Sequence, residues 1–392
     1  MKRIAILGFG VVGGGVAQLL TENKEQLLSL LGEEISLDYI LDLRDFPNSP
    51  FSDKVIHDFD IILQSEVDTV IEAMGGSHPA YEYTVAALRA KKNVITSNKE
   101  VVSLYLDEFL SLADENGVVY RFEASVGGGI PVISPLISLL RHNKIREVRG
   151  ILNGTTNYIL TKMFAFGENF QDALAEAQAK GYAERIPDAD VLGTDAARKI
   201  SILASLIDER LVDVREVYTE GITGIRARDI QRLAKVHHSI KLIGRAVFAD
   251  FHTVLVCPHA VPYDSPLFSV HGVYNAVEVV AEPLGNVMFY GQGAGAGATA
   301  SAMVSDLTLT YLEGRNYAIP RVKGKATISS YERFSCRFYI VTSEKPTSLP
   351  DGYQVIEECD DECAYFTPLT TLECLKNVFG EAKMSTILPI LE

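Results

Sequence analysis

Short apolar runs alternate with longer helical patterns over the first third of the chain. Five runs have the length and composition of buried strands: residues 2–7, 35–42, 68–73, 93–96 and 118–124. Between them, apolar positions recur at helical spacing and predict helices: one that ends near residue 32, then 79–90 and 100–116. Strands that alternate with helices predict a parallel, doubly wound sheet. Ligands of such sheets bind beyond the carboxyl ends of the strands.

A glycine-rich turn joins the first predicted strand to the first predicted helix. Its sequence is Gly8-Phe9-Gly10-Val11-Val12-Gly13. The first glycine permits a tight turn, the second lets a pyrophosphate approach the backbone, and the third lets helix and strand pack closely. Lys2-Arg3 and the uncharged residues after them would also suit a signal peptide, but five glycines within residues 4–20 argue against export. We therefore predict an N-terminal Rossmann domain.

Two residues at the end of the second predicted strand predict opposite preferences for the dinucleotide. An acid at Asp42 would bind a ribose 2′-hydroxyl, whereas Arg44 would accept a 2′-phosphate. Cofactor choice therefore stays open between NAD and NADP, with Arg44 favouring NADP. Further cofactor contacts are expected after the later strands and before a helix near residue 300, at Met74, Gly75, Thr96, Ser97, Lys99 and Gly295.

Candidate catalytic groups gather at residues 181–199. Apolar positions at helical spacing predict a helix that begins at Thr194, and Asp195 and Lys199 lie four residues apart on one face of it. That face also carries apolar residues, so we expect a partly buried pair that orients and protonates a substrate. The alternative is a surface ion pair, which contributes only about 0.3–0.5 kcal/mol.

A second glycine cluster occupies residues 123–131. Three consecutive glycines after a strand let the backbone curl and turn carbonyl oxygens inward, which suits a hard cation. A flexible hinge that leaves the nucleotide-binding domain explains the same glycines equally well.

Composition narrows the class of protein. The 392 residues, 47% of them apolar and 22% charged, allow two or three ordinary globular domains. A net charge of −15 argues against nucleic acid and anionic membrane surfaces as partners. Five cysteines are too few and too scattered for a disulfide framework, so we expect a cytoplasmic protein. No segment is apolar for long enough to span a bilayer.

In six ordered motifs within residues 1–310 the chain resembles the homoserine dehydrogenases. They are Gly8-Phe9-Gly10-Val11-Val12-Gly13, Thr96-Ser97-Asn98-Lys99, Glu123-Ala-Ser-Val-Gly-Gly-Gly-Ile-Pro131, Gly150-Ile-Leu-Asn-Gly-Thr-Thr-Asn-Tyr158, Gly181-Tyr-Ala-Glu184 and Gly193-Thr-Asp195-Ala-Ala-Arg-Lys199. The resemblance implies NAD(P)-dependent interconversion of L-homoserine and L-aspartate 4-semialdehyde. It also implies an α/β protein with a Rossmann domain at residues 1–131, an α+β catalytic and dimerisation domain at 132–303, a return segment at 304–323 and a small ACT-like α+β appendage at 324–392.

The resemblance also implies roles for single residues. Lys199 would donate the proton, with Asp195 beside it, and Lys99 would lie between cofactor and substrate. Glu184, Asp190 and Asp195 would bind the substrate's ammonium group. A sodium ion would bind at the positions Glu123, Val126, Gly128 and Ile130. The chain would form a homodimer through the sheet of the second domain.

Two other functions compete with this interpretation. A phosphorylating semialdehyde dehydrogenase needs a cysteine nucleophile, and Cys257 is the only candidate in the catalytic domain. A dinucleotide sensor without catalysis would have no use for Lys199, Asp195 and Glu184 together. For the C-terminal appendage we prefer a capping or dimer-stabilising role to regulation by an amino acid.

Overall fold

The computed structural model describes residues 1–249, 252–314, 319–343, 349, 351–359, 361–380 and 383–392. These form two compact units, each assembled from separate stretches of chain. The first unit comprises Met1–Asn143, Ser201–Val214 and Gly291–Ala326, and the second comprises Lys144–Ile200, Arg215–Tyr290 and Thr327–Glu392.

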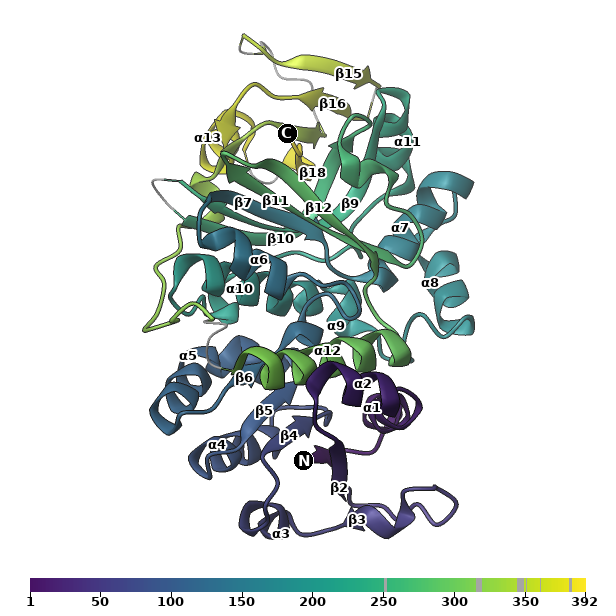
Figure 1. Cartoon of the computed structure of the whole chain (residues 1–392). Coiled ribbons are helices and arrows are strands. Elements are labelled where there is room, and N and C mark those ends of the chain that lie inside the picture. The colour runs from purple at the N-terminus through teal and green to yellow at the C-terminus, as the bar shows by residue number, and fades with distance from the viewer. Residues whose placement is uncertain (250–251, 315–318, 344–348, 350, 360, 381–382) are drawn as a thin grey trace. The chain divides into compact units, whose positions relative to one another are not determined.

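A six-stranded parallel sheet forms the centre of the first unit (Figure 1). Its strand order is β3-β2-β1-β4-β5-β6, so the order reverses between β1 and β4. The doubly wound parallel sheet that the alternation of strands and helices predicted is therefore confirmed. The strands are β1 (Lys2–Leu7), β2 (Ile35–Leu41), β3 (Val55–Ile56), β4 (Thr69–Glu72), β5 (Asn93–Thr96) and β6 (Tyr120–Arg121). Ligands of a doubly wound sheet bind at such a reversal.

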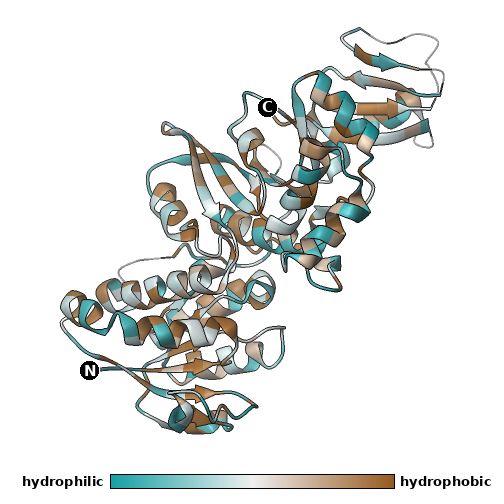
Figure 2. Ribbon diagram, turned by 90° about the vertical axis from the view of Figure 1, so that its right-hand side faces the viewer, coloured by the Kyte–Doolittle hydropathy of each residue, from teal (hydrophilic) through white to brown (hydrophobic). Residues whose placement is uncertain are grey.

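Helices cover this sheet and complete its core. They are α1 (Val11–Glu22), α2 (Lys24–Leu31), α3 (Phe59–Gln64), α4 (Ala80–Arg89), α5 (Lys99–Asn116) and α12 (Ala296–Glu313), and α6 (Ile133–Leu140) also belongs to this unit. The strands near the N-terminus are mostly brown in Figure 2, because both faces of the sheet are buried. A Cβ atom at Gly15 of α1 would lie 3.2 Å from the Ala300 Cβ of α12, so this glycine lets the two helices approach closely.

A mixed six-stranded sheet forms the centre of the second unit, in the order β12-β11-β7-β9-β10-β8. Its strands are β7 (Lys144–Ile151), β8 (Tyr218–Thr219), β9 (His238–Phe248), β10 (His252–Pro262), β11 (Tyr274–Glu282) and β12 (Gly285–Gln292). The helices are α7 (Gly154–Phe166), α8 (Phe170–Ala179), α9 (Asp188–Val191), α11 (Ala227–Lys235) and the first part of α10 (Thr194–Asp208), which from Ser201 on belongs to the first unit. A Cβ at Gly244 of β9 would lie 3.3 Å from the Ile200 Cβ, so α10 begins directly against this sheet.

The C-terminal residues form a separate antiparallel sheet within the second unit. Its order is β15-β16-β14-β18, and helix α13 (Leu372–Phe379) packs against it. The strands are β14 (Phe338–Thr342), β15 (Gln354–Glu358), β16 (Cys363–Phe366) and β18 (Met384–Pro389), with a short pair β13 (Ser335–Cys336) and β17 (Thr370–Thr371) beside them.

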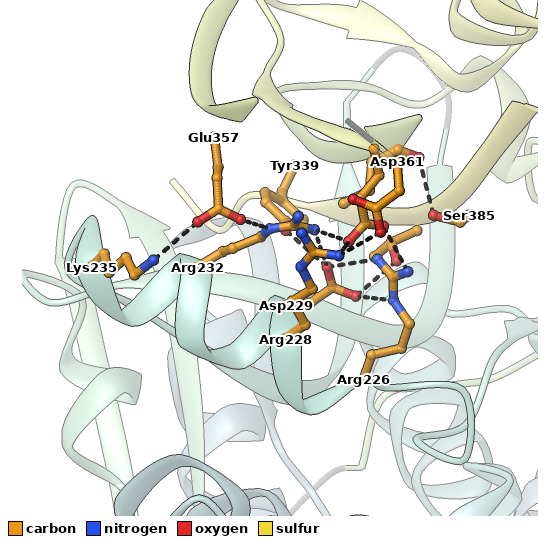
Figure 3. A network of polar contacts seen from close by, with 12 residues as sticks. Arg226, Arg228, Asp229, Arg232, Lys235, Tyr339, Glu357, Asp361 and Ser385 are labelled. Carbon is orange, nitrogen blue, oxygen red and sulfur yellow. Dashed lines mark hydrogen bonds and ion pairs between the residues drawn. The ribbon is translucent and has the colours of Figure 1, made fainter. Parts of the chain in front are cut away.

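Helix α11 binds this C-terminal sheet through charged side chains (Figure 3). The Asp229 carboxylate accepts hydrogen bonds from the Tyr339 hydroxyl of β14 at 2.9 Å and from Arg226 at 2.7 and 2.9 Å. Arg232 forms ion pairs with Glu357 at 2.5 Å and with Glu362 at 2.8 Å. Every residue of β14 is buried, because α13 and α11 pack on the sheet from different parts of the chain.

Candidate active site

A cavity of about 470 Å³ opens in the first unit beyond the carboxyl ends of β1 and β4. Its lining includes Gly8, Gly10, Asp42, Arg44, Met74 and Gly75. All six were proposed from the sequence as possible contacts of the dinucleotide, with Asp42 and Arg44 as competing contacts at its ribose. The structure therefore brings them together at the point where the strand order reverses.

The geometry of the glycine-rich turn fits a dinucleotide. A Cβ at Gly13 would lie 2.0 Å from the carbonyl oxygen of Gly8, so only glycine lets α1 pack this closely on the turn. A Cβ at Gly10 would meet no protein atom within 4 Å, which leaves the backbone at the start of α1 open to a ligand. Gly8 itself has φ +88°, a left-handed conformation that favours glycine.

Asp42 and Arg44 are bound to each other. The Arg44 guanidinium donates two hydrogen bonds of 3.0 Å to the Asp42 carboxylate, and the backbone N–H of Phe9 donates a third at 2.8 Å. The hydrogen bond from Arg44 is the main cause that lowers the pKa of Asp42 to about 2. His57, which sequence reasoning missed, donates from Nδ1 to the Asp42 carbonyl oxygen at 2.7 Å and also lines the cavity. This hydrogen bond raises the pKa of His57.

Two further residues that sequence reasoning missed connect the loops around this cavity. Glu72, at the end of β4, accepts hydrogen bonds from the Met74 N–H at 2.7 Å and from the Thr96 hydroxyl at 2.5 Å. Asn98 donates to the Gly76 carbonyl oxygen at 2.7 Å. Burial raises the pKa of Glu72 to about 7. A carboxyl group at the end of an otherwise apolar strand was the only signal in the sequence.

The remaining cofactor candidates also lie in the first unit. Lys99 is the first residue of α5, directly after its N-cap Asn98, and its backbone N–H donates to the Ser97 carbonyl oxygen at 3.1 Å. Gly295 is the N-cap of α12 and has φ +129°. Val11 and Val12 form the first turn of α1. Their contacts with a cofactor remain predictions.

The second unit contains a buried lysine–aspartate pair at the start of α10. Lys199 Nζ donates to the Asp195 carboxylate at 2.8 Å and to the Leu152 carbonyl oxygen at 2.7 Å. The two side chains are only 9% and 6% exposed. The two residues therefore form a buried pair and not the surface ion pair that their four-residue spacing also allowed. Two acceptors on different elements fix the direction of this ammonium group.

Asp190 belongs to the same cluster. The Asn153 side-chain amide donates to Asp190 at 2.7 Å and to Asp195 at 2.9 Å. Burial raises the pKa of Asp190. Glu184 lies in the loop before α9 with an exposed side chain, and its backbone carbonyl oxygen accepts a hydrogen bond from Gln178. The structure thus assembles Lys199, Asp195 and Asp190, while substrate binding by Glu184 remains a prediction.

The predicted cation positions are only partly compatible with a metal ion. The Glu123 carboxylate accepts hydrogen bonds of 2.7, 2.8 and 2.8 Å from the backbone N–H groups of Val132, Ile133 and Ser134, so it caps the start of α6. The predicted strand 118–124 is shorter in the structure, Tyr120–Arg121, and a 3₁₀ turn follows it at Glu123–Ser125. Only backbone oxygens would then serve a cation. Within the described part of the chain, no three His, Cys, Asp or Glu side chains converge as metal ligands.

These features define a class of protein. The first unit has a doubly wound sheet with a glycine-rich dinucleotide turn, and the second has a buried lysine held by an acid. Both features are typical of a nicotinamide-dependent oxidoreductase. The family models "Homoserine dehydrogenase, NAD binding domain" and "Homoserine dehydrogenase" match residues 8–123 and 131–308. The chain belongs to the homoserine dehydrogenase family and is an oxidoreductase.

Individual relatives agree with this assignment. The chain is 41% identical to the homoserine dehydrogenase of Bacillus subtilis over 78% of its own length and 72% of that protein. A crystal structure of a homoserine dehydrogenase from Thiobacillus denitrificans matches all of this chain and 98% of its own, with TM-score 0.89 and 29% identity. A mutant of a hyperthermophilic archaeal homoserine dehydrogenase in complex with NADPH matches 80% of this chain and 98% of its own, with TM-score 0.69 and 28% identity.

The architecture expected from the sequence, a nucleotide-binding parallel sheet, a mixed second sheet and a small C-terminal sheet, is thereby confirmed. None of the helices in the described ranges combines the length and apolarity that a bilayer crossing requires.

Proposed function

We propose that the first unit binds NAD(P) and that Lys199 of the second unit handles the proton in the interconversion of L-homoserine and L-aspartate 4-semialdehyde. The observation that carries this proposal is the buried contact of Lys199 with Asp195 and the Leu152 carbonyl oxygen. A lysine in such a setting has its ammonium group aimed by fixed acceptors, as a proton donor requires.

The bound dinucleotide supplies or accepts the hydride. In the reducing direction the aldehyde oxygen gains negative charge as the hydride arrives at its carbon, and Lys199 delivers a proton to that oxygen to give the alcohol. In the oxidising direction Lys199 takes the hydroxyl proton while the hydride leaves. Burial of the lysine–aspartate pair keeps water from screening this charge, so the ammonium stabilises the developing alkoxide more strongly than in water.

Carboxylates near Lys199 suit the substrate's α-ammonium group. Asp190 and Asp195 both accept hydrogen bonds from the side-chain amide of Asn153, and Glu184 lies in the loop before α9. We assign the ammonium-binding role to Asp190 and Asp195, with Glu184 as a third acid that the substrate reaches from solvent. A charge-assisted hydrogen bond of this kind is about twice as strong as a neutral one.

NADP is the cofactor that we favour. The Arg44 side chain lines the cavity and is 64% exposed. Its guanidinium can therefore leave the Asp42 carboxylate and bind a 2′-phosphate instead. One similar structure was solved with NADPH, which supports the choice.

The backbone carbonyl groups of Glu123, Val126, Gly128 and Ile130 are retained as the proposed sodium site. Equal rates in sodium and potassium buffers would remove the ion from the proposal.

A homodimer is part of the same proposal. Strand β12 is at the edge of the mixed sheet, and its side chains Met288 and Tyr290 are exposed. The Tyr290 ring stacks on that of Tyr274 in β11, with 5.2 Å between the ring centroids. An edge strand with exposed large apolar side chains suits pairing with a second copy of the chain. Light scattering should give twice the chain mass. All five cysteines are free thiols, which fits our assignment to the cytoplasm.

Replacing Lys199 by methionine tests the proposal. Lys199→Met keeps the length of the side chain but removes the proton and the charge, so kcat should fall by about 10²–10⁴-fold. Cofactor affinity should stay within about twofold, because the dinucleotide binds to the other unit. The matched control is Lys180→Met, which breaks another i,i+4 ion pair, with Glu176, at the surface. A kcat loss below tenfold for Lys199→Met, or an equal loss in the control, would exclude Lys199 as the donor.

A further inference from the structure

Asn153 occupies a junction between three elements of the second unit. It follows β7 and is the N-cap residue of α7, where its side-chain oxygen accepts a hydrogen bond from the Thr156 N–H at 2.9 Å. The residue is only 5% exposed. It lies within one of the sequence motifs of the family, in which no role was assigned to it on sequence grounds.

The nitrogen of the same side chain faces two acids. Nδ2 donates to Asp190 at 2.7 Å and to Asp195 at 2.9 Å, and the Asp195 oxygen that accepts this bond also accepts from Lys199. An asparagine amide has two N–H donors and one oxygen acceptor, so one buried side chain uses its full capacity here. No other side chain of this length combines two donors with a helix-capping acceptor.

We propose that Asn153 is a positioning residue that holds Asp190 and Asp195 together as an ionised pair for the substrate's ammonium group. This inference rests on the proposed function. Two carboxylates brought close together repel each other, so that one of them tends to take up a proton. An amide that donates to both offsets this repulsion and fixes the direction of each carboxylate. The same amide keeps Asp195 in place beside Lys199.

The groups around Asp190 agree with this role. After burial, the hydrogen bond from Asn153 is the largest influence on Asp190, and it lowers the pKa, whereas the charge of Asp195 raises it. Thr155 of α7 and Lys199 of α10 also face Asp190, and both lower its pKa. Loss of the amide therefore removes the strongest of these stabilising contacts and leaves the repulsion by Asp195.

The simpler explanation is that Asn153 only caps α7. Serine and aspartate cap helices about as well as asparagine, so substitution separates the two roles. Asn153→Ser keeps a capping oxygen and removes both donors to the acids. Asn153→Asp keeps the shape and the cap, but places a third carboxylate against Asp190 and Asp195. The matched control is Asn169→Ser, because Asn169 caps α8 in the same way, at 3.0 Å from the Asp172 N–H, on the surface of the same unit.

The experiment compares Tm and the pH dependence of homoserine oxidation in the wild type and these three variants. Asn153→Ser should melt within a few degrees of Asn169→Ser. It should also raise KM for homoserine about 10-fold to 100-fold, the equivalent of hydrogen bonds to charged groups, with a smaller change in kcat. The acid limb of its kcat/KM profile should move to higher pH, and Asn153→Asp should show a larger effect.

Kinetics of Asn153→Ser that match Asn169→Ser, or an acid limb that does not move, would overturn the proposal. A fall in Tm of Asn153→Ser far beyond that of the control, with an unchanged KM for homoserine in the folded variant, would show that the residue acts only on the fold. Absence of homoserine turnover in the wild type would refute the proposed function as well. Normal wild-type turnover with unaffected Asn153 variants would refute this proposal alone.

Discussion

At the scale of single residues, our proposal that Arg44 selects NADP requires it to exchange its Asp42 partner for a 2′-phosphate. In the structure it is bound to Asp42, so binding a 2′-phosphate replaces a carboxylate with a phosphate. We expect Arg44→Ala to weaken NADP binding more than NAD binding, by a differential on the order of 1.5–3 kcal/mol. Titration of both cofactors against wild type and variant measures it. Equal losses for NAD and NADP would show that Arg44 does not bind the 2′-phosphate.

The buried carboxyl group of Glu72 should make the stability of the protein depend on pH. Burial raises its pKa to about 7, above the value of about 4.3 in an unfolded chain. Folding therefore favours the protonated form, so the stability that Glu72 contributes is present below about pH 4 and is lost as pH rises through 7. Relative to Glu72→Gln, the wild type should lose on the order of 3 kcal/mol of unfolding free energy between pH 4 and pH 8. Denaturant unfolding at both pH values measures the difference, and parallel pH curves would contradict the pKa.

The sequence predicted residues that belong to a repeating pattern or a known turn. Gly13 packs as the glycine motif requires, and helical spacing placed Asp195 beside Lys199. Asn153 and Glu72 were missed because a single polar residue at the end of a strand carries no periodic signal. Their partners come from loops distant in sequence, and only the folded chain shows that these loops meet.

At the scale of elements, helix α11 depends on charge for its contact with the C-terminal sheet. Arg232 is almost fully buried between Glu357 and Glu362, which keep Lys235 and Arg226 as further partners. Arg232→Met removes the most buried cation of this network and should cost up to about 3–5 kcal/mol. Arg146→Met is the control, since Arg146 pairs with the exposed Glu282 at the surface and its loss should change stability little. Denaturant unfolding compares the two variants. Equal effects would show that burial of the Arg232 pairs is unimportant.

Prediction of elements succeeded where apolar spacing was regular. Helix α10 and strands β1, β2 and β4 formed within one or two residues of their predicted limits. Helix α11 was not identified, because its apolar residues are few and its buried surface includes Asp229 and Arg232. Ile230 and Leu233 are its only fully buried apolar side chains, and the C-terminal partners of its charged residues lie more than 100 residues further along the chain.

At the scale of the whole molecule, the chain distributes its chemistry over two units. The first holds the dinucleotide cavity, and the second holds the cluster of Lys199, Asp195 and Asp190. Sequence motifs predicted both sets of residues, because each motif is local. The family resemblance implied a return segment at 304–323, whereas the grouping of residues 201–214 with the nucleotide-binding sheet could not be predicted from local patterns, since it depends on contacts between segments far apart in sequence.

Transfer of hydrogen from homoserine to the cofactor is the central claim, and an isotope measurement tests it most directly. Homoserine that carries deuterium on its hydroxymethyl carbon is incubated with the purified chain and oxidised NADP or NAD, and the mass of the reduced cofactor is determined. We predict that each reduced nicotinamide carries one deuterium, and that unlabelled homoserine in deuterated water gives none. Reduced cofactor without the label, or no reduction with either dinucleotide, would contradict the assigned reaction.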